Sequence, residues 1–298
     1  MSLAARKSDR STNAALRRAL RARAQRGLRE IEARGADAST HELRKRVKEV
    51  RGLLHLLRPG LQGGKALDRS LRDAARMLAP RRDLEVMLTT FDGLTARLRA
   101  PQDFAGLRWH IIDVARKTPA SDQKAAIRNY SRIFIAFDTK VNSLVLRDKA
   151  SRLMWMGILS TLTRAQALQK MAQHAANTDL DATPFHDWRK AVKQHWYQAR
   201  FLEKIAPAKM KAHVARIDAL GEILGDHNEL DVLATFLNTR PDLSDTDTRA
   251  LTIFNRHMMD HRRTLAANAL LQAETALGTP PKRLVGRWQG QWRCWRKG

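Results

Sequence analysis

Two segments of the chain carry histidine, arginine and lysine at the spacing of one helical face, a pattern suited to holding an anion. At about 100° per residue, the cations of the first segment fall within about 120° of arc. They are His41, Arg44, Lys45, Lys48, Arg51 and His55. The corresponding face of the second segment carries His186, Arg189, Lys190, Lys193 and Arg200. Like charges three and four residues apart repel one another on a helix, so we expect an anion to relieve them.

The opposite sides of both segments are apolar, which predicts amphipathic helices packed against a core. In the first segment the apolar residues are Leu43, Val47, Val50, Leu53, Leu54 and Leu57. In the second they are Val192, Ala199 and Leu202. His195 falls among them, so we predict that it is a core residue and not a ligand. Glu42 and Glu49 lie outside the cationic arc, toward its flank and the boundary with the apolar face. In the second segment, Trp196 replaces the cation that Arg51 supplies in the first.

The whole chain shares this excess of positive charge. Its 298 residues include 55 Lys and Arg against 30 Asp and Glu, which gives a net charge of +25 and a pI near 11.3. Apolar residues make up 43%, enough for a folded core and too many for a disordered chain. Because so basic a protein repels itself, we expect a polyanionic partner: nucleic acid, an anionic membrane or polyphosphate.

Nearly the whole sequence is predicted to be helical. Ala, Leu, Arg, Lys, Glu and Gln dominate it, alternating β-branched runs are nearly absent, and proline and glycine mark the breaks. The predicted helices are 12–33, 40–58, 64–79, 82–99, 103–117, 121–148, 152–176, 185–205, 208–224, 228–238 and 246–277. Thr40 and the segment 181–184 are predicted N-cap regions of the two cationic helices.

A second pair of related segments follows the cationic helices in the same order. These are LAPRRDLEV at 78–86 and LGDHNELDV at 224–232. Two motifs repeated in order indicate a duplicated helical unit. We therefore predict an all-α fold of two antiparallel helical bundles, related by approximate two-fold symmetry around a basic groove or channel. The predicted divisions are 1–150 for the first bundle, 151–283 for the second and 284–298 for a basic, Trp-rich tail.

Further arginines could enlarge the basic surface. Arg72, Arg76, Arg81 and Arg82 follow the first cationic helix. Asp218 and Glu222 occupy the positions that match Arg72 and Arg76 in the second half, so we expect an asymmetric site. The predicted N-terminal helix either widens the anion-binding surface or forms an ordinary solvated face; its arginines are Arg17, Arg18, Arg21, Arg23, Arg26 and Arg29.

The C-terminal segment places three tryptophans at helical spacing among basic residues. They are Trp288, Trp292 and Trp295. We predict that they dock on the helical bundle. The alternatives are stacking on nucleic-acid bases and anchoring at an anionic membrane.

These motifs resemble the CHAD family, the conserved-histidine α-helical domain. Its helix motif corresponds to His41, Arg44, Lys48, Arg51 and 58-RP-59, and then to His186, Arg189, Lys193 and Tyr197. Its second motif corresponds to 78–86 and 224–232, the latter including His227. The departures are Trp196 in place of Arg, Ala79 in place of Gly, and Glu85 and Glu229 in place of Asp.

The resemblance implies two helical bundles around a basic central channel that binds inorganic polyphosphate. It also implies association with polyphosphate granules. No catalytic activity, cofactor or metal is expected. Some family members are fused to a CYTH domain. The segment 30-EIEAR-34 resembles the signature of that domain only superficially. The residues expected to bind polyphosphate are His41, Arg44, Lys45, Lys48, Arg51, His55, Arg72, Arg76, Arg81, Arg82, His186, Arg189, Lys190, Lys193, Tyr197, Arg200 and His227.

Three other functions remain open from the residues. Nucleic-acid binding fits the charge, but the sequence lacks a helix-turn-helix signature, zinc-ligand spacing and RNP-type strands. A metal-dependent phosphohydrolase could use His174, His186, Asp187 and Asp231, although neighbouring Arg and Lys would repel the metal. The basic face could also dock an acidic protein.

The expected location is the cytoplasm, with polyphosphate granules as the addition that the resemblance implies. The chain has one cysteine, Cys294, and its N-terminus lacks the apolar segment of a secretion signal. The longest uncharged apolar stretch, 153–162, is too short to span a bilayer.

Overall fold

The computed structural model describes residues 3–35, 39–98, 100–117, 120–178 and 183–297, without the side chains of 79–82 and 120–122. Within this part the chain is helical and forms no strand; a single isolated bridge joins Leu61 and Leu146. The predicted all-α class is therefore confirmed.

The helices of the first half follow the predicted order. They are α1 (Thr12–Arg34), α2 (Thr40–Leu57), α3 (Gly64–Met77), α4 (Ala79–Thr95), α5 (Ala105–Lys117) and α6 (Ala120–Lys140). The cationic helix α2 begins one residue after Ser39, whose hydroxyl accepts a hydrogen bond from the backbone N–H of Glu42 at 3.4 Å. Ser39 is therefore the N-cap, and the predicted cap Thr40 is the first helical residue.

The second half is built from longer helices. They are α7 (Ala150–Thr178), α8 (Thr183–Phe201), α9 (Pro207–Asn238), α10 (Asp245–Leu277) and α11 (Pro281–Lys297). The predicted break between 224 and 228 is wrong, because α9 runs through Gly225 without interruption. The N-cap region predicted before α8 includes residues 181 and 182, which lie outside the described residues.

The predicted helix 121–148 ends early, at Lys140. A short 3-10 helix covers Val141–Ser143, and the segment then pairs with the loop after α2. The N–H of Gln62 donates to the carbonyl of Val145 at 3.0 Å, and the N–H of Arg147 donates to that of Gly60 at 2.9 Å. This pairing competes with continued helix, since it satisfies the same backbone groups.

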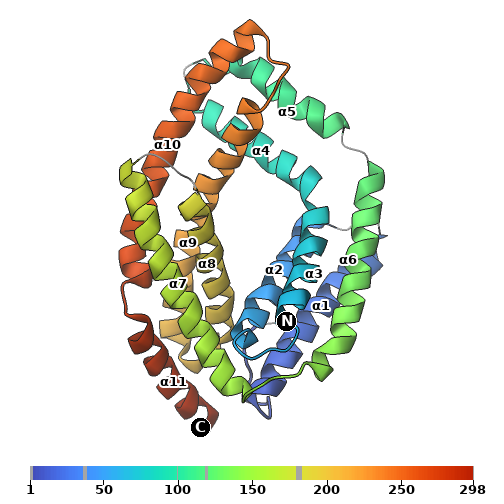
Figure 1. Ribbon diagram of the computed structural model, residues 1–298, viewed down its shortest axis with the longest axis vertical. Coiled ribbons are helices and arrows are strands. Elements are labelled where there is room, and N and C mark those ends of the chain that lie inside the picture. Colours follow the sequence, from blue (N-terminus) through green and yellow to red (C-terminus); the bar gives the residue numbers. More distant parts are fainter. Residues whose placement is uncertain (1–2, 36–38, 99, 118–119, 179–182, 298) are drawn as a thin grey trace.

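Figure 1 shows how the helices are arranged. Helices α7 to α11 lie on one side and α1, α2, α3 and α6 on the other, with α4 and α5 across the top. The two sides meet at both ends: α2 contacts α8 and α7, and α4 contacts α9. The cationic helices α2 and α8 therefore lie side by side.

The hydrophobic core combines residues from both sides of the predicted boundary at residue 150. Its larger cluster combines first-half residues such as Leu53 and Phe134 with second-half residues such as Trp188 and Leu220. A smaller cluster joins α4 and α5 to α9 and α10. The six apolar residues predicted for the buried face of α2 are all buried. The division into two symmetric bundles stays a prediction.

Several arginines of α1 hold the fold. Arg17 donates to the carbonyls of Val141 and Leu144 at 2.5 and 2.7 Å. Arg18 and Arg21 pair with carboxylates, while Arg26 and Arg29 are exposed. The N-terminal helix is therefore largely committed to structural contacts.

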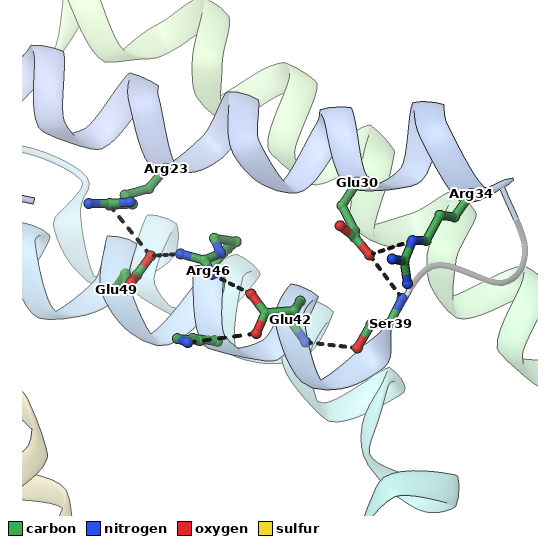
Figure 2. Close-up of polar contacts among 8 residues, drawn as sticks. Arg23, Glu30, Arg34, Ser39, Glu42, Arg46 and Glu49 are labelled. Carbon is green, nitrogen blue, oxygen red and sulfur yellow. Dashed lines mark hydrogen bonds and ion pairs between the residues drawn. The ribbon is translucent and has the colours of Figure 1, made fainter. Parts of the chain in front are cut away.

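A buried ion network joins α1 to α2 (Figure 2). Arg46 donates to Glu49 at 2.6 Å, and Arg23 of α1 lies 3.5 Å from the same carboxylate oxygen. These three residues are only 2–3% exposed. Arg46 also donates to Glu42. Glu49, which the spacing places at the boundary between the cationic and apolar faces, is therefore a core carboxylate held by two arginines.

The Trp-rich segment docks on the molecule, as predicted. Trp288 and Trp292 of α11 are buried. Trp288 packs against His195 and His213, and Trp292 against Trp155 of α7. His195 is fully buried and shares a 2.8 Å hydrogen bond with His213, which confirms it as a core residue. None of the described helices is long and apolar enough to span a membrane.

Candidate functional site

The two cationic helices cross closely because one of them carries a glycine at the contact. A Cβ atom on Gly52 of α2 would lie 2.6 Å from the Cβ of Tyr197 on α8, closer than packed atoms allow. Tyr197 is buried in this crossing, and burial raises the pKa of its hydroxyl. Tyr197 was predicted as a ligand; its contact with Gly52 shows that it also sets the distance between the helices.

Four cations from the two helices gather beside this crossing, and we call them the α2–α8 cation cluster. They are Arg44, Lys48, Arg189 and Lys193. Burial among protein atoms lowers the pKa of Lys48, and the charges of the other three lower it further, to about 8. The Lys48 side chain still reaches solvent, so protein surrounds it on several sides without excluding water. Among described residues, Lys48 has no ion-pair partner.

Arg189 is the counterpart of Arg44 on α8 and is held more deeply. Burial lowers its pKa, although Glu229 and Glu222 oppose this effect. Its Nε is buried and has no hydrogen-bond partner in the described part of the chain. An unpartnered guanidinium N–H has a strong tendency to bind an acceptor.

The side chain of Lys193 packs over α9 at Gly221. A Cβ on Gly221 would lie 2.9 Å from the Cε of Lys193. The lysine ammonium lies 3.3 Å from Asp218 and also pairs with Glu222. The expected asymmetry between the halves is therefore present, because acids that match Arg72 and Arg76 neutralise a cation of α8.

In the first half, carboxylates of α3 and α4 also pair with α2. Arg51 donates to Asp68 at 2.8 and 3.1 Å, and the Nε2 of His55 lies 3.1 Å from the same carboxylate. Burial opposes ionisation of Asp68, but hydrogen bonds from His55 and Arg51 outweigh it and lower its pKa. Arg44 donates to Asp83 at 2.7 Å. The cationic face is therefore partly neutralised by neighbouring helices.

Trp196 takes part in the cationic face through its ring. The guanidinium of Arg200 lies 4.6 Å from the ring centroid, and the ammonium of Lys193 lies 5.4 Å from it. Both separations fall within the range of cation–π attraction. Trp196 thus removes one charge from α8 while it orients two others.

The remaining predicted ligands lie at the edges of this surface. His41 is exposed at the start of α2. Lys45 and Lys190 pair with acids on their own helices at 3.6 and 2.9 Å. Arg72 and Arg76 are exposed on α3. The side chains of Arg81 and Arg82 lie outside the described residues.

His186 and His227 line a different part of the molecule, a pocket of about 900 Å³ between α7, α8, α9 and α10. The Nδ1 of His186 is hydrogen-bonded to Asn228, and His227 stacks on Phe185 at 4.4 Å. None of the α2–α8 cation cluster lines this pocket. The sequence thus groups on one face residues that the structure divides between two sites.

Sequence reasoning missed the groups that define the cluster's charge and shape. Asp68 and Asp83 partner the cations of α2, and Gly52 and Gly221 allow the close approaches. The two glycines were visible in the sequence, whereas the ion-pair partners depend on tertiary packing. Within the described part, no group of three or more His, Cys, Asp and Glu could hold a metal ion.

Comparisons with known proteins agree with this fold. A family model described as the CHAD domain matches residues 14–238. The structure is similar to the crystal structure of the CHAD domain from the plant Ricinus communis, with a TM-score of 0.57, 20% identity and 94% of each chain covered. It is also similar to PptA from Streptomyces chartreusis, with a TM-score of 0.51, 16% identity, and 93% of this chain and 98% of that chain covered. None of the curated proteins matches the chain.

Proposed function

Because the chain belongs to the CHAD domain family, we propose that it binds inorganic polyphosphate at the α2–α8 cation cluster, without a catalytic step. In this proposal the cluster is part of a basic channel between the two halves. The family resemblance supplies the ligand, and the cluster supplies the observation that supports it: four cations from both halves meet where two helices cross.

Lys48 is the residue that carries this proposal. It reaches solvent, has no ion-pair partner among the described residues, and is surrounded by three like charges that lower its pKa. Such a site is electrostatically unfavourable when empty and is relieved by an anion. Arg189 adds a buried Nε without a partner.

A linear polyanion fits this arrangement better than a single phosphate. The cluster cations sit on two helices, and Arg51, Arg200 and the exposed Arg72 could continue the path. Repeated phosphates along one chain can engage such separated cations at once, which multiplies weak contacts. Arg44 would exchange its carboxylate partner Asp83 for phosphate oxygens.

A salt titration tests the proposal. Affinity for long-chain polyphosphate is expected to fall steeply as salt rises, because binding releases counterions, and to exceed the affinity for duplex DNA and single-stranded RNA of equal charge. The polyphosphate recovered afterwards should have its original chain length. Equal affinity for all three polymers would favour nucleic-acid binding instead, and shortened chains would refute the non-catalytic part.

One argument for the alternative function, nucleic-acid binding, is weaker. Trp288 and Trp292, two of the three tryptophans that could have stacked on bases, are buried against the core. Association with polyphosphate granules is a further part of our proposal, because a granule presents the same polymer at high local density.

Binding should depend on pH through Lys48. Its pKa near 8 means that raising the pH from 7 to 9 removes its charge in the free protein, whereas bound phosphate favours the protonated form. Affinity is therefore expected to fall about tenfold between pH 7 and pH 9 at constant ionic strength. Lys48→Arg is the control, because arginine stays charged over this range and should abolish the dependence. A Lys48→Arg variant with an unchanged pH profile would contradict the assignment.

A further inference from the structure

The pocket of about 900 Å³ between α7, α8, α9 and α10 has the size and chemistry of a small-molecule site. Its position separates it from the proposed polyphosphate site, since none of the α2–α8 cation cluster lines it. Its lining mixes positive and hydrogen-bonding groups with apolar side chains. On α10 both kinds follow one another along one helical face: Met259, Arg262, Arg263, Ala266, Ala267 and Leu270.

The polar part of the lining is suited to a phosphate group. Arg262 and Arg263 of α10 belong to it together with His186 and His227, and Asp231 is the one carboxylate among the described lining residues. The Nη1 of Arg262 lies 3.3 Å from Asp231. Two arginines against one carboxylate leave this part of the lining positive, and a guanidinium fork suits two phosphate oxygens.

The first turn of α8 adds to this part of the lining. Thr183, Phe185 and His186 all belong to that turn and all line the pocket. The helix dipole favours an anion at such a helix start. His227 is a neutral hydrogen-bonding group at pH 7, because burial and the nearby Arg262 lower its pKa to about 4.

The apolar part of the lining would be left bare by a phosphate alone. Met259, about one turn before Arg262 and Arg263 on α10, and Val232, next to Asp231 on α9, remain 50% and 42% exposed. The other apolar lining residues include Phe185, Ala266, Ala267 and Leu270. A ligand that covers Met259 and Val232 must carry an apolar group of its own, which polyphosphate does not.

We propose that this pocket binds a small organic phosphate, a phosphomonoester attached to an apolar group, as a second ligand site of the chain. The phosphate would meet Arg262 and Arg263, and the apolar group would cover the neighbouring Met259 and Val232. The site is independent of the proposed polyphosphate function, because it uses none of the cluster residues.

Titration calorimetry with phenyl phosphate on the full chain tests this site. Phenyl phosphate is expected to bind at least tenfold more tightly than inorganic phosphate, which contacts only the polar part of the lining. It should exceed benzyl alcohol by the same factor, because benzyl alcohol carries no phosphate. Ala267→Phe fills the pocket from an exposed position of α10 and should weaken phenyl phosphate binding at least tenfold, with polyphosphate affinity unchanged.

Arg262→Gln provides a second variant if Ala267→Phe folds poorly, and it should cause a similar loss. Equal affinity for phenyl phosphate and inorganic phosphate would overturn the proposal, as would tight binding that survives both variants. Loss of phenyl phosphate binding in Lys48→Gln/Arg189→Gln would also overturn it, because it would assign that ligand to the polyphosphate site.

Discussion

Replacing Lys48 and Arg189 together with glutamine is expected to weaken polyphosphate binding about 100-fold. Lys48 is exposed and has no described ion-pair partner, and the half-buried Arg189 lies close enough to lower that lysine's pKa, so each can give a charge-assisted hydrogen bond to phosphate. Such bonds contribute about 1.5–3 kcal/mol each, so losing two costs at least about 3 kcal/mol. Since about 1.4 kcal/mol corresponds to a tenfold change in affinity, two orders of magnitude follow.

The double substitution Lys48→Gln/Arg189→Gln should leave the fold intact. Neither side chain has an ion pair with a described residue, so the substitutions strand no buried carboxylate partner. Removing Lys48 also relieves its repulsion with Arg44 and Lys193. The free energy of unfolding is therefore expected to change by less than about 1 kcal/mol.

The matched control also removes one lysine and one arginine, but from another surface. Lys282 and Arg283 are exposed on α11, which packs mainly against α7. Lys282→Gln/Arg283→Gln should reduce polyphosphate affinity only slightly, through the lower net charge. Equal losses in the two double variants, measured by titration at one salt concentration, would mean that net charge and not the cluster binds the polymer.

The local patterns of the sequence were enough to predict the helices and the buried faces. The apolar residues of α2 recur every three or four positions, and helical periodicity alone decides which side is buried. His195 was predicted as a core residue for the same reason. The tryptophans of α11 followed the same rule, and two of them are buried.

The local charge pattern could not predict which cations are free. Arg51 and Lys193 look equivalent to Lys48 on a helical wheel, yet Asp68, Asp218 and Glu222 neutralise them from other helices. These partners are decided by packing between helices, which no spacing within one helix encodes. The continuity of α9 also depends on packing, because Gly225 lies where α8 crosses it and a neighbouring helix supports the backbone.

The burial of Arg46 and Glu49 depends on tertiary packing. Spacing placed Glu49 outside the cationic arc of α2, at the boundary with the apolar face, and α1 packs against this side and buries it. A carboxylate can be buried there because Arg23 arrives from α1 and Arg46 from the preceding turn. The sequence contains both arginines, but their distances to Glu49 depend on how α1 docks.

This network leads to the largest stability effect that we expect. Glu49→Gln should lower the free energy of unfolding by about 3–5 kcal/mol, because it leaves two buried guanidinium groups without their shared carboxylate. Glu42 can compensate Arg46 only in part, since it is itself half-exposed. Urea unfolding of the variant beside the unmodified chain measures the difference.

An exposed pair supplies the control for this effect. Asp92→Asn removes an equally well-formed pair with Arg108, at 2.7 Å, whose side chains are 47% and 44% exposed, and should cost less than about 1 kcal/mol. Replacing the whole network, as Arg23→Met/Arg46→Met/Glu49→Leu, should recover most of the loss, because no charge is then left buried. If the triple variant is as unstable as Glu49→Gln, the cost arises from lost hydrogen bonds and packing, and the explanation by uncompensated charge is wrong.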